Sequence, residues 1–224
     1  MIIKVCGMRE PRNIREVAAL AINWIGFIFY ERSKRFVGQS PARQQAADSE
    51  QQTVNTDAKQ LSTVTGQLST KKVGVFVNAT IESMMEKASA YKLDYLQLHG
   101  NESPETCHTL QKRGYSLIKA FPIASKEDFE KTKEYEGRVD YFLFDTKCES
   151  FGGSGRQFDW SMLADYKGET PFLLSGGIHP ESVEAIRKFQ HPRFAGIDLN
   201  SGFEIEPGLK DIDKLKKFIQ QIQT

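Results

Sequence analysis

Eight short apolar runs recur along the chain, and their spacing limits the possible folds more than any other feature. They are rich in Val, Ile, Phe and Leu and rarely alternate with polar residues, which is typical of strands buried on both faces of a parallel sheet. Most starts lie 22 to 24 residues apart, which leaves room for a crossover helix and two loops. The runs cover residues 2–5, 24–29, 72–77, 94–98, 116–121, 140–144, 171–174 and 194–199.

Helical patterns fill the intervals between these runs. Apolar residues recur at helical spacing over residues 11–22, 81–91, 180–189 and 209–222. Ser103 precedes Pro104, as an N-cap precedes a proline at the first helical position. Eight strands, each followed by a helix, predict a single-domain α/β fold, a (β/α)8 TIM barrel. An open doubly wound sheet is the alternative, and the number of strands favours closure.

Composition narrows the class of protein. The 224 residues suffice for one domain, and 30 Lys and Arg against 29 Asp and Glu give a net charge of +1, without the basic surplus of a nucleic-acid binder. No apolar run approaches the roughly 20 residues that span a membrane, and the N-terminus lacks a secretory pattern. Cys6, Cys107 and Cys148 cannot form a closed set of pairs, which favours reduced thiols in the cytoplasm. Their spacing does not match a zinc site.

One segment interrupts the regular spacing of the apolar runs. Residues 39–70 are rich in Gln, Ser, Thr and Ala and explain the longest interval between runs. This composition predicts a polar surface insertion after the second strand. A lid over the barrel mouth is the functional alternative.

The active site of such a barrel lies at the C-terminal ends of its strands. Cys6 ends the first run, where it is either a buried cysteine or a thiolate base or nucleophile. Asp145 ends the sixth run, where it either caps the next loop or acts as a general acid. His99 is either a ligand donor or a satisfied core histidine. Asp198 is expected to orient the last loop.

Two loops suggest the ligand class. Gly176-Gly177 follows the seventh run and Asn200-Ser201-Gly202 follows the eighth, so backbone N–H groups can approach an anion there. Phosphate sites of this fold form between these two loops. The pattern therefore predicts a small phosphorylated ligand.

Several motifs, in this order, resemble the successive strand motifs of the phosphoribosylanthranilate isomerase family. The resemblance covers nearly the whole chain, apart from the Gln-rich segment, which is longer than the family usually carries. The motifs are KVCGM at 4–8, GFIFYERSKRFV at 26–37, VGVFVN at 73–78, LQLHG at 96–100, IKAF at 118–121, LFDT at 143–146, GGSGRQFDW at 152–160, LSGGIHPESV at 174–183 and DLNSGFE at 198–204.

The resemblance implies an Amadori rearrangement in tryptophan biosynthesis. Asp145 would be the general acid that opens the ribose ring, and Cys6 the base that removes the C2 proton. Arg35 matches the residue expected to bind the anthranilate carboxylate, and the phosphate would rest on Gly176, Gly177 and residues 200–202. Neither a cofactor, a metal nor an obligate protein partner is implied. Lys4 or Arg35, if close, would lower the pKa of Cys6.

Three other interpretations compete. A histidine-pathway aminoaldose isomerase would be expected to carry a carboxylate where Cys6 stands. Indole-glycerol-phosphate synthase needs a strand-borne catalytic lysine, for which Lys119 is the candidate. A non-catalytic sensor of a phosphorylated ligand would not need both Cys6 and Asp145.

Overall fold

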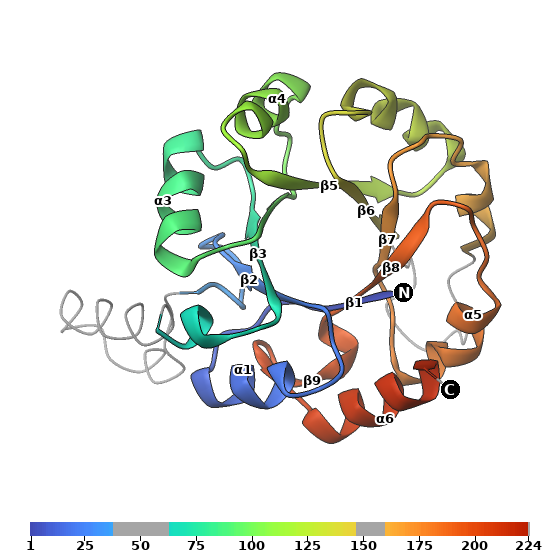
Figure 1. Cartoon of the computed structure of the whole chain (residues 1–224). Coiled ribbons are helices and arrows are strands. Elements are labelled where there is room, and N and C mark those ends of the chain that lie inside the picture. Colours follow the sequence, from blue (N-terminus) through green and yellow to red (C-terminus); the bar gives the residue numbers. More distant parts are fainter. Residues whose placement is uncertain (38–62, 147–159, 224) are drawn as a thin grey trace.

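Eight parallel strands close into a barrel in the computed structural model, which describes residues 1–37, 63–146 and 160–223. Neighbouring strands follow the chain order, and β8 pairs with β1 to close the ring (Figure 1). The predicted (β/α)8 barrel is confirmed. The strands are β1 Ile2–Val5, β2 Trp24–Ile28, β3 Lys71–Phe76, β4 Tyr95–Leu98, β5 Ser116–Ile123, β6 Tyr141–Thr146, β7 Phe172–Ser175 and β8 Phe194–Leu199.

Helices surround the barrel (Figure 1). The described α-helices are α1 Pro11–Ala18, α3 Ile81–Tyr91, α4 Pro104–Lys112, α5 Val183–Lys188 and α6 Ile212–Gln223. Ser103 caps α4 as expected, because its hydroxyl accepts the Thr106 N–H. Among the described residues after β5 and β6, 3₁₀ helices lie at Lys126–Tyr135 and Trp160–Asp165, and further 3₁₀ turns lie at Pro180–Ser182 and Ser201–Phe203.

Two predicted helix ends were wrong. The first helix ends at Ala18, not residue 22, because the following residues return the chain to the sheet, where Asn23 bonds the backbone of Ile3. The last helix starts at Ile212, not residue 209. Leu209–Lys210 forms the short strand β10, which pairs with β9 (Glu204–Glu206).

The barrel interior changes character along its axis. Trp24, Tyr95 and Tyr141 begin strands β2, β4 and β6. Trp24 stacks on Tyr95, with ring centroids 4.6 Å apart, and Tyr141 contacts Trp24 edge-on. Apolar side chains such as Val73 and Leu173 pack beside them. This layer fills the N-terminal end of the barrel. Polar side chains occupy the interior nearer the C-terminal ends, where the site lies.

The predicted insertion at 39–70 lies largely outside the described residues. Its last part is described, and residues 63–67 form a helical turn. Val64 and Thr65 are buried there, and Val64 belongs to the main core between strands and helices. Val64 and Thr65 therefore pack against the barrel, whereas Thr63, Gly66 and Gln67 of the same turn are exposed.

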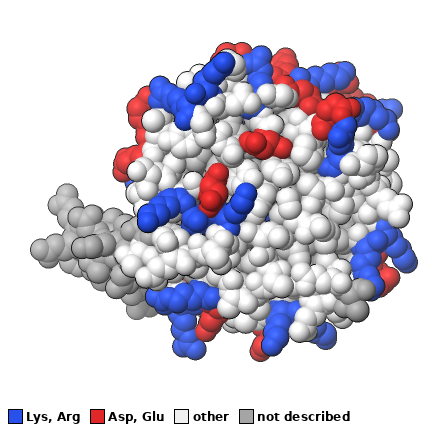
Figure 2. Space-filling model, in the orientation of Figure 1, with Lys and Arg blue, Asp and Glu red and all other residues white. Residues whose placement is uncertain are grey.

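The surface carries charges of both signs. Positive and negative side chains are interspersed around the margin of the face in Figure 2. No helix in the described parts of the chain is long and apolar enough to cross a membrane.

Candidate active site

A cavity of about 500 Å³ opens at the C-terminal ends of the strands. Most of the predicted site residues line it together, and Arg35 and Gly202 are the exceptions. The predicted residues that line the cavity are Cys6, His99, Asp145, Gly176, Gly177, Asp198, Asn200 and Ser201.

Cys6 directly follows β1 and is only 3% exposed. Its neighbour across the sheet is Gly26 on β2. A Cβ atom at Gly26 would lie 2.6 Å from the Cys6 sulfur and 3.1 Å from its Cα. A glycine at this position therefore creates the space that the thiol occupies.

Replacing Gly26 with alanine should displace the thiol and lower kcat by roughly 10²-fold, the typical cost of misplacing a reacting group by about 1 Å. Overpacking should also reduce stability by about 1–3 kcal/mol. The matched control is Gly66→Ala, because a Cβ there meets only ordinary contacts with Lys92. Steady-state kinetics and thermal unfolding of both variants test this. An unchanged kcat in Gly26→Ala would contradict it.

Lys4 lies inside the barrel on β1, two residues before Cys6, and was not among the predicted site residues. It is fully buried, and its ammonium donates to Asp198 Oδ1 at 2.9 Å. The sheet register pairs the same two residues across β1 and β8. Asp198 is therefore bound to Lys4 and lines the cavity, whereas it was expected to orient a loop.

Lys4 lowers the pKa of Cys6 as expected, but the net shift of that pKa is upward. Burial raises the pKa of the thiol above its ordinary value, and attraction from Lys4 reverses this only in part. Burial alone would lower the pKa of Lys4, but Asp198 and Cys6 raise it, so Lys4 remains a cation. A buried thiol thus lies beside a buried positive charge.

Asp145 faces His99 across the mouth of the cavity. The Asp145 Oδ2 atom lies 3.6 Å from His99 Nε2, and the two side chains are 38% and 35% exposed. Gln97 contacts the other ring nitrogen, His99 Nδ1, at 2.9 Å. His99 is therefore a residue of the cavity wall with a polar partner on each side, not a histidine of the apolar core.

The two glycine-rich loops meet at one side of the cavity. Gly176 and Gly177 have φ values of 83° and 66°, which side-chain-bearing residues rarely adopt. Both line the cavity, as do Asn200 and Ser201 of the loop after β8. Gly202 instead lies against the backbone of Ile178 in the neighbouring loop. The loops thus present backbone groups to one end of the cavity.

Arg35 is bound to a carboxylate of the protein. Its Nε and Nη2 atoms donate to Glu204 Oε1 and Oε2 at 2.8 and 2.5 Å. Lys210 Nζ donates to Glu204 Oε1 at 2.7 Å and to Asn200 Oδ1 at 2.8 Å. Burial raises the pKa of Glu204, but Arg35 and Lys210 outweigh it and lower the value to about 2. Glu204 therefore links the Arg35 segment to the Asn200 loop, and sequence reasoning missed this link.

Lys119 is not part of the cavity wall. Its side chain is 3% exposed, and its ammonium forms an ion pair of 3.1 Å with Glu102. The indole-glycerol-phosphate synthase alternative thus loses its candidate lysine. Among the described residues, no group of His, Cys, Asp and Glu is arranged to hold a metal ion.

Fold and cavity together define a class. The protein is a (β/α)8 barrel with a cavity at its C-terminal end that holds a thiol, a carboxyl group and an imidazole beside two glycine-rich loops. Such a wall suits acid–base chemistry on a small anionic molecule.

Comparison with known proteins identifies the family. The sequence matches the model of the N-(5'phosphoribosyl)anthranilate (PRA) isomerase family over residues 3–221, so the chain belongs to that family. A relative from Parabacteroides distasonis named N-(5'-phosphoribosyl)anthranilate isomerase is 81% identical over 222 residues, which are 99% of this chain and 93% of the relative.

Solved structures agree with this assignment. Phosphoribosyl anthranilate isomerase from Thermotoga maritima has a TM-score of 0.80 and 32% identity, over 100% of this chain and 99% of that chain. A phosphoribosyl anthranilate isomerase in complex with reduced 1-(o-carboxyphenylamino)-1-deoxyribulose 5-phosphate has a TM-score of 0.78 and 30% identity, with the same coverage. The resemblance found in the sequence is confirmed.

Proposed function

We propose that the chain isomerises N-(5'-phosphoribosyl)anthranilate to 1-(2-carboxyphenylamino)-1-deoxyribulose 5-phosphate, with Asp145 as general acid and Cys6 as general base. The observation that carries this proposal is that both groups line one cavity, beside two glycine-rich loops, in a member of the isomerase family. The reaction belongs to tryptophan biosynthesis.

The chemistry needs one proton donor and one proton acceptor. Asp145 gives its proton to the ring oxygen of the ribose, the C1–O bond breaks, and the amine lone pair forms a protonated Schiff base. Cys6 as thiolate then takes the proton from C2, and the electron pair of that C–H bond neutralises the iminium nitrogen. The resulting enolamine tautomerises to the ketone. No atom is gained or lost overall.

The loops after β7 and β8 suit one end of the substrate. Backbone N–H groups of Gly176, Gly177 and the loop at Asn200 and Ser201 suit the phosphate. Gly202 supports this loop by its close packing on Ile178. The carboxylate of the anthranilate is assigned to Arg35, which does not line the cavity and is bound to Glu204, while Asp198 and His99 line the cavity. We infer a cytoplasmic location, which the free thiols of Cys6 and Cys107 support.

The loss of phosphoribosylanthranilate fluorescence on addition of the purified protein tests the proposal. Turnover at substoichiometric enzyme is expected. Binding of the substrate without turnover would favour the sensor, and turnover of the histidine-pathway aminoaldose alone would favour the other isomerase.

Arg35→Ala should weaken the binding of ligands that carry the anthranilate carboxylate by about 1.5–3 kcal/mol, the value of a charge-assisted hydrogen bond. A product analogue without that carboxylate should bind the wild type and the variant equally. Arg12→Ala removes an arginine that is 84% exposed and serves as the control. Calorimetric titration measures both ligands. Equal losses for the two ligands would show that Arg35 only supports Glu204.

A further inference from the structure

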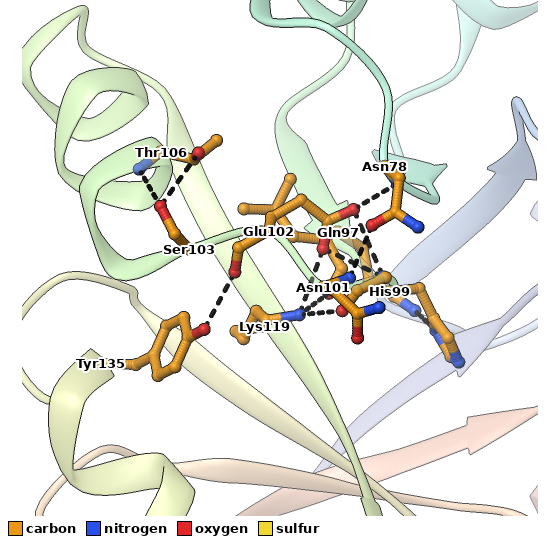
Figure 3. Close-up of polar contacts among 11 residues, drawn as sticks. Asn78, Gln97, His99, Asn101, Glu102, Ser103, Thr106, Lys119 and Tyr135 are labelled. Atoms are coloured by element: carbon orange, nitrogen blue, oxygen red, sulfur yellow. Dashed lines mark hydrogen bonds and ion pairs between the residues drawn. The ribbon is translucent and has the colours of Figure 1, made fainter.

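His99 and Gln97 form a hydrogen-bonded pair at the end of β4 (Figure 3). Residues two apart on a strand project to the same side, here into the barrel. The Gln97 amide nitrogen lies 2.9 Å from His99 Nδ1. An amide N–H donates, so Nδ1 accepts, and in the neutral ring the proton is on Nε2. Nε2 is the nitrogen that faces Asp145.

The backbone on both sides of His99 is fixed as well. Lys119 Nζ donates to the carbonyl oxygens of Leu98 and Gly100 at 3.2 and 2.7 Å. Glu102 accepts the Gly100 N–H at 2.9 Å, and the Glu102 and Lys119 side chains are 2% and 3% exposed (Figure 3). This buried pair holds the chain that carries the imidazole, so only rotation about the side-chain bonds of His99 remains to be controlled.

A glutamine at position 97 destabilises the fold, because it buries a polar group. It is 1% exposed, and among the described residues its Oε1 atom has no hydrogen-bond partner. A buried carbonyl oxygen without a partner destabilises a fold, whereas an apolar side chain of similar size would not. Packing alone therefore does not explain a glutamine at this point of the cavity wall, where its amide contacts His99.

We propose that Gln97 is a positioning residue, which holds His99 with its proton on Nε2 so that the imidazole orients the carboxyl group of Asp145. The inference rests on the proposed role of Asp145 as general acid.

The geometry shows how such orientation works. When the Nε2–H group of His99 donates to Asp145 Oδ2, the other oxygen, Oδ1, is left to carry the proton to the substrate. The gap of 3.6 Å is slightly longer than a hydrogen bond, and Asp145 is exposed enough to turn toward the ring. Hydrogen bonds of catalytic groups commonly shorten once substrate is bound.

Gln97→Met tests the proposal, because methionine keeps the length of the side chain and removes the amide. We expect kcat to fall about tenfold, less than the roughly 10²-fold cost of a misplacement by 1 Å, with little change in KM. The Tm should stay equal or rise, since an unpartnered buried oxygen is lost. Gln111→Met, which removes an exposed glutamine bonded to a backbone carbonyl, is the control and should leave kcat unchanged.

The tautomer of His99 supplies a readout independent of turnover. Nitrogen-15 NMR of the wild type should show the proton on Nε2, and Gln97→Met should show a mixture of tautomers. A wild-type ring protonated on Nδ1, or a variant with unaltered tautomer, would overturn the proposal. So would a tautomer change with unchanged kcat, or a fall in kcat that merely follows a fall in Tm.

A double-mutant cycle tests whether Gln97 acts through His99. His99→Phe should lower kcat by at least the same factor, and Gln97→Met should cause no further loss in that variant. Independent, multiplying losses would overturn the proposal. A wild-type protein without isomerase activity would instead refute the proposed function, and the NMR result would still report on the Gln97–His99 contact.

Discussion

Cys6→Ala and Asp145→Asn should each lower kcat by about 10²–10⁴-fold, because each removes a positioned base or acid. Both variants should fold and bind a product analogue, since neither change buries a new charge or leaves a large cavity. Stopped-flow or steady-state fluorescence at high enzyme concentration measures the residual rate. Cys6→Ser is the sharper variant, because a hydroxyl is a much weaker base than a thiolate at neutral pH.

Two controls separate these roles from general effects of the substitutions. Cys107→Ala removes a buried thiol that does not line the cavity, and Asp165→Asn removes an exposed carboxylate. Both controls should keep nearly full kcat. Retention of more than a small fraction of kcat in Cys6→Ala or Asp145→Asn would refute the assigned role.

Lys4→Met should lower the plateau of kcat/KM and shift its alkaline limb to higher pH. In the reactive form of the enzyme, Cys6 is a thiolate and Asp145 is protonated. In the more abundant form, Cys6 is a thiol and Asp145 is a carboxylate. Both forms hold the same number of protons. The ratio of these two forms is therefore independent of pH, and on the alkaline side activity falls when Cys6 ionises in the abundant form.

The sign of the Lys4 effect follows from the charges that face Cys6. Burial raises the pKa of the thiol, Lys4 and Lys210 lower it, and Asp198 raises it. Loss of Lys4 thus raises the pKa of Cys6 further, and each unit of increase makes the reactive form about tenfold rarer. A pH profile of kcat/KM from pH 5 to 10 shows both effects. A lower plateau with an unmoved alkaline limb would contradict this role of Lys4.

Stability must be followed in the same variant. Lys4→Met leaves the Asp198 carboxylate buried without its partner, and such a change typically costs about 3–5 kcal/mol. The double variant Lys4→Met/Asp198→Asn removes the whole ion pair and should recover part of this loss. Thermal unfolding of the single and double variants measures the loss of stability and its partial recovery.

The strands could be predicted from the sequence because a strand that is buried on both faces of its sheet consists of an almost continuous apolar run. All eight runs agree with the observed strands to within two residues at either end. The largest differences are at the ends of β5 and β6, which extend to Ile123 and Thr146 instead of residues 121 and 144. Helix ends were less predictable. Leu209 suits a helix by its apolar character, but pairing with β9 places it in a strand.

The catalytic candidates were also accessible from the sequence, because strand ends map directly onto the mouth of a barrel. The residues that contact these candidates could not be predicted from the sequence. Lys4 interrupts an apolar run and Gln97 interrupts another, which are signals of a polar interior, yet neither shows which residue it meets. The contact between Arg35 and Glu204 forms only when the barrel closes, because 169 positions separate the two residues in the chain.

The pairing of Lys4 with Asp198 also bears on how the chain folds during its synthesis. The two residues are 194 positions apart, so the lysine leaves the ribosome long before its carboxylate exists. At about 5–20 residues per second, the interval is roughly 10–40 s. During this time β1 lacks the strand that closes the ring, and burial of Lys4 would leave its charge without a counter-ion. The first strand of the nascent chain must therefore wait for the last before the interior of the barrel can become dry.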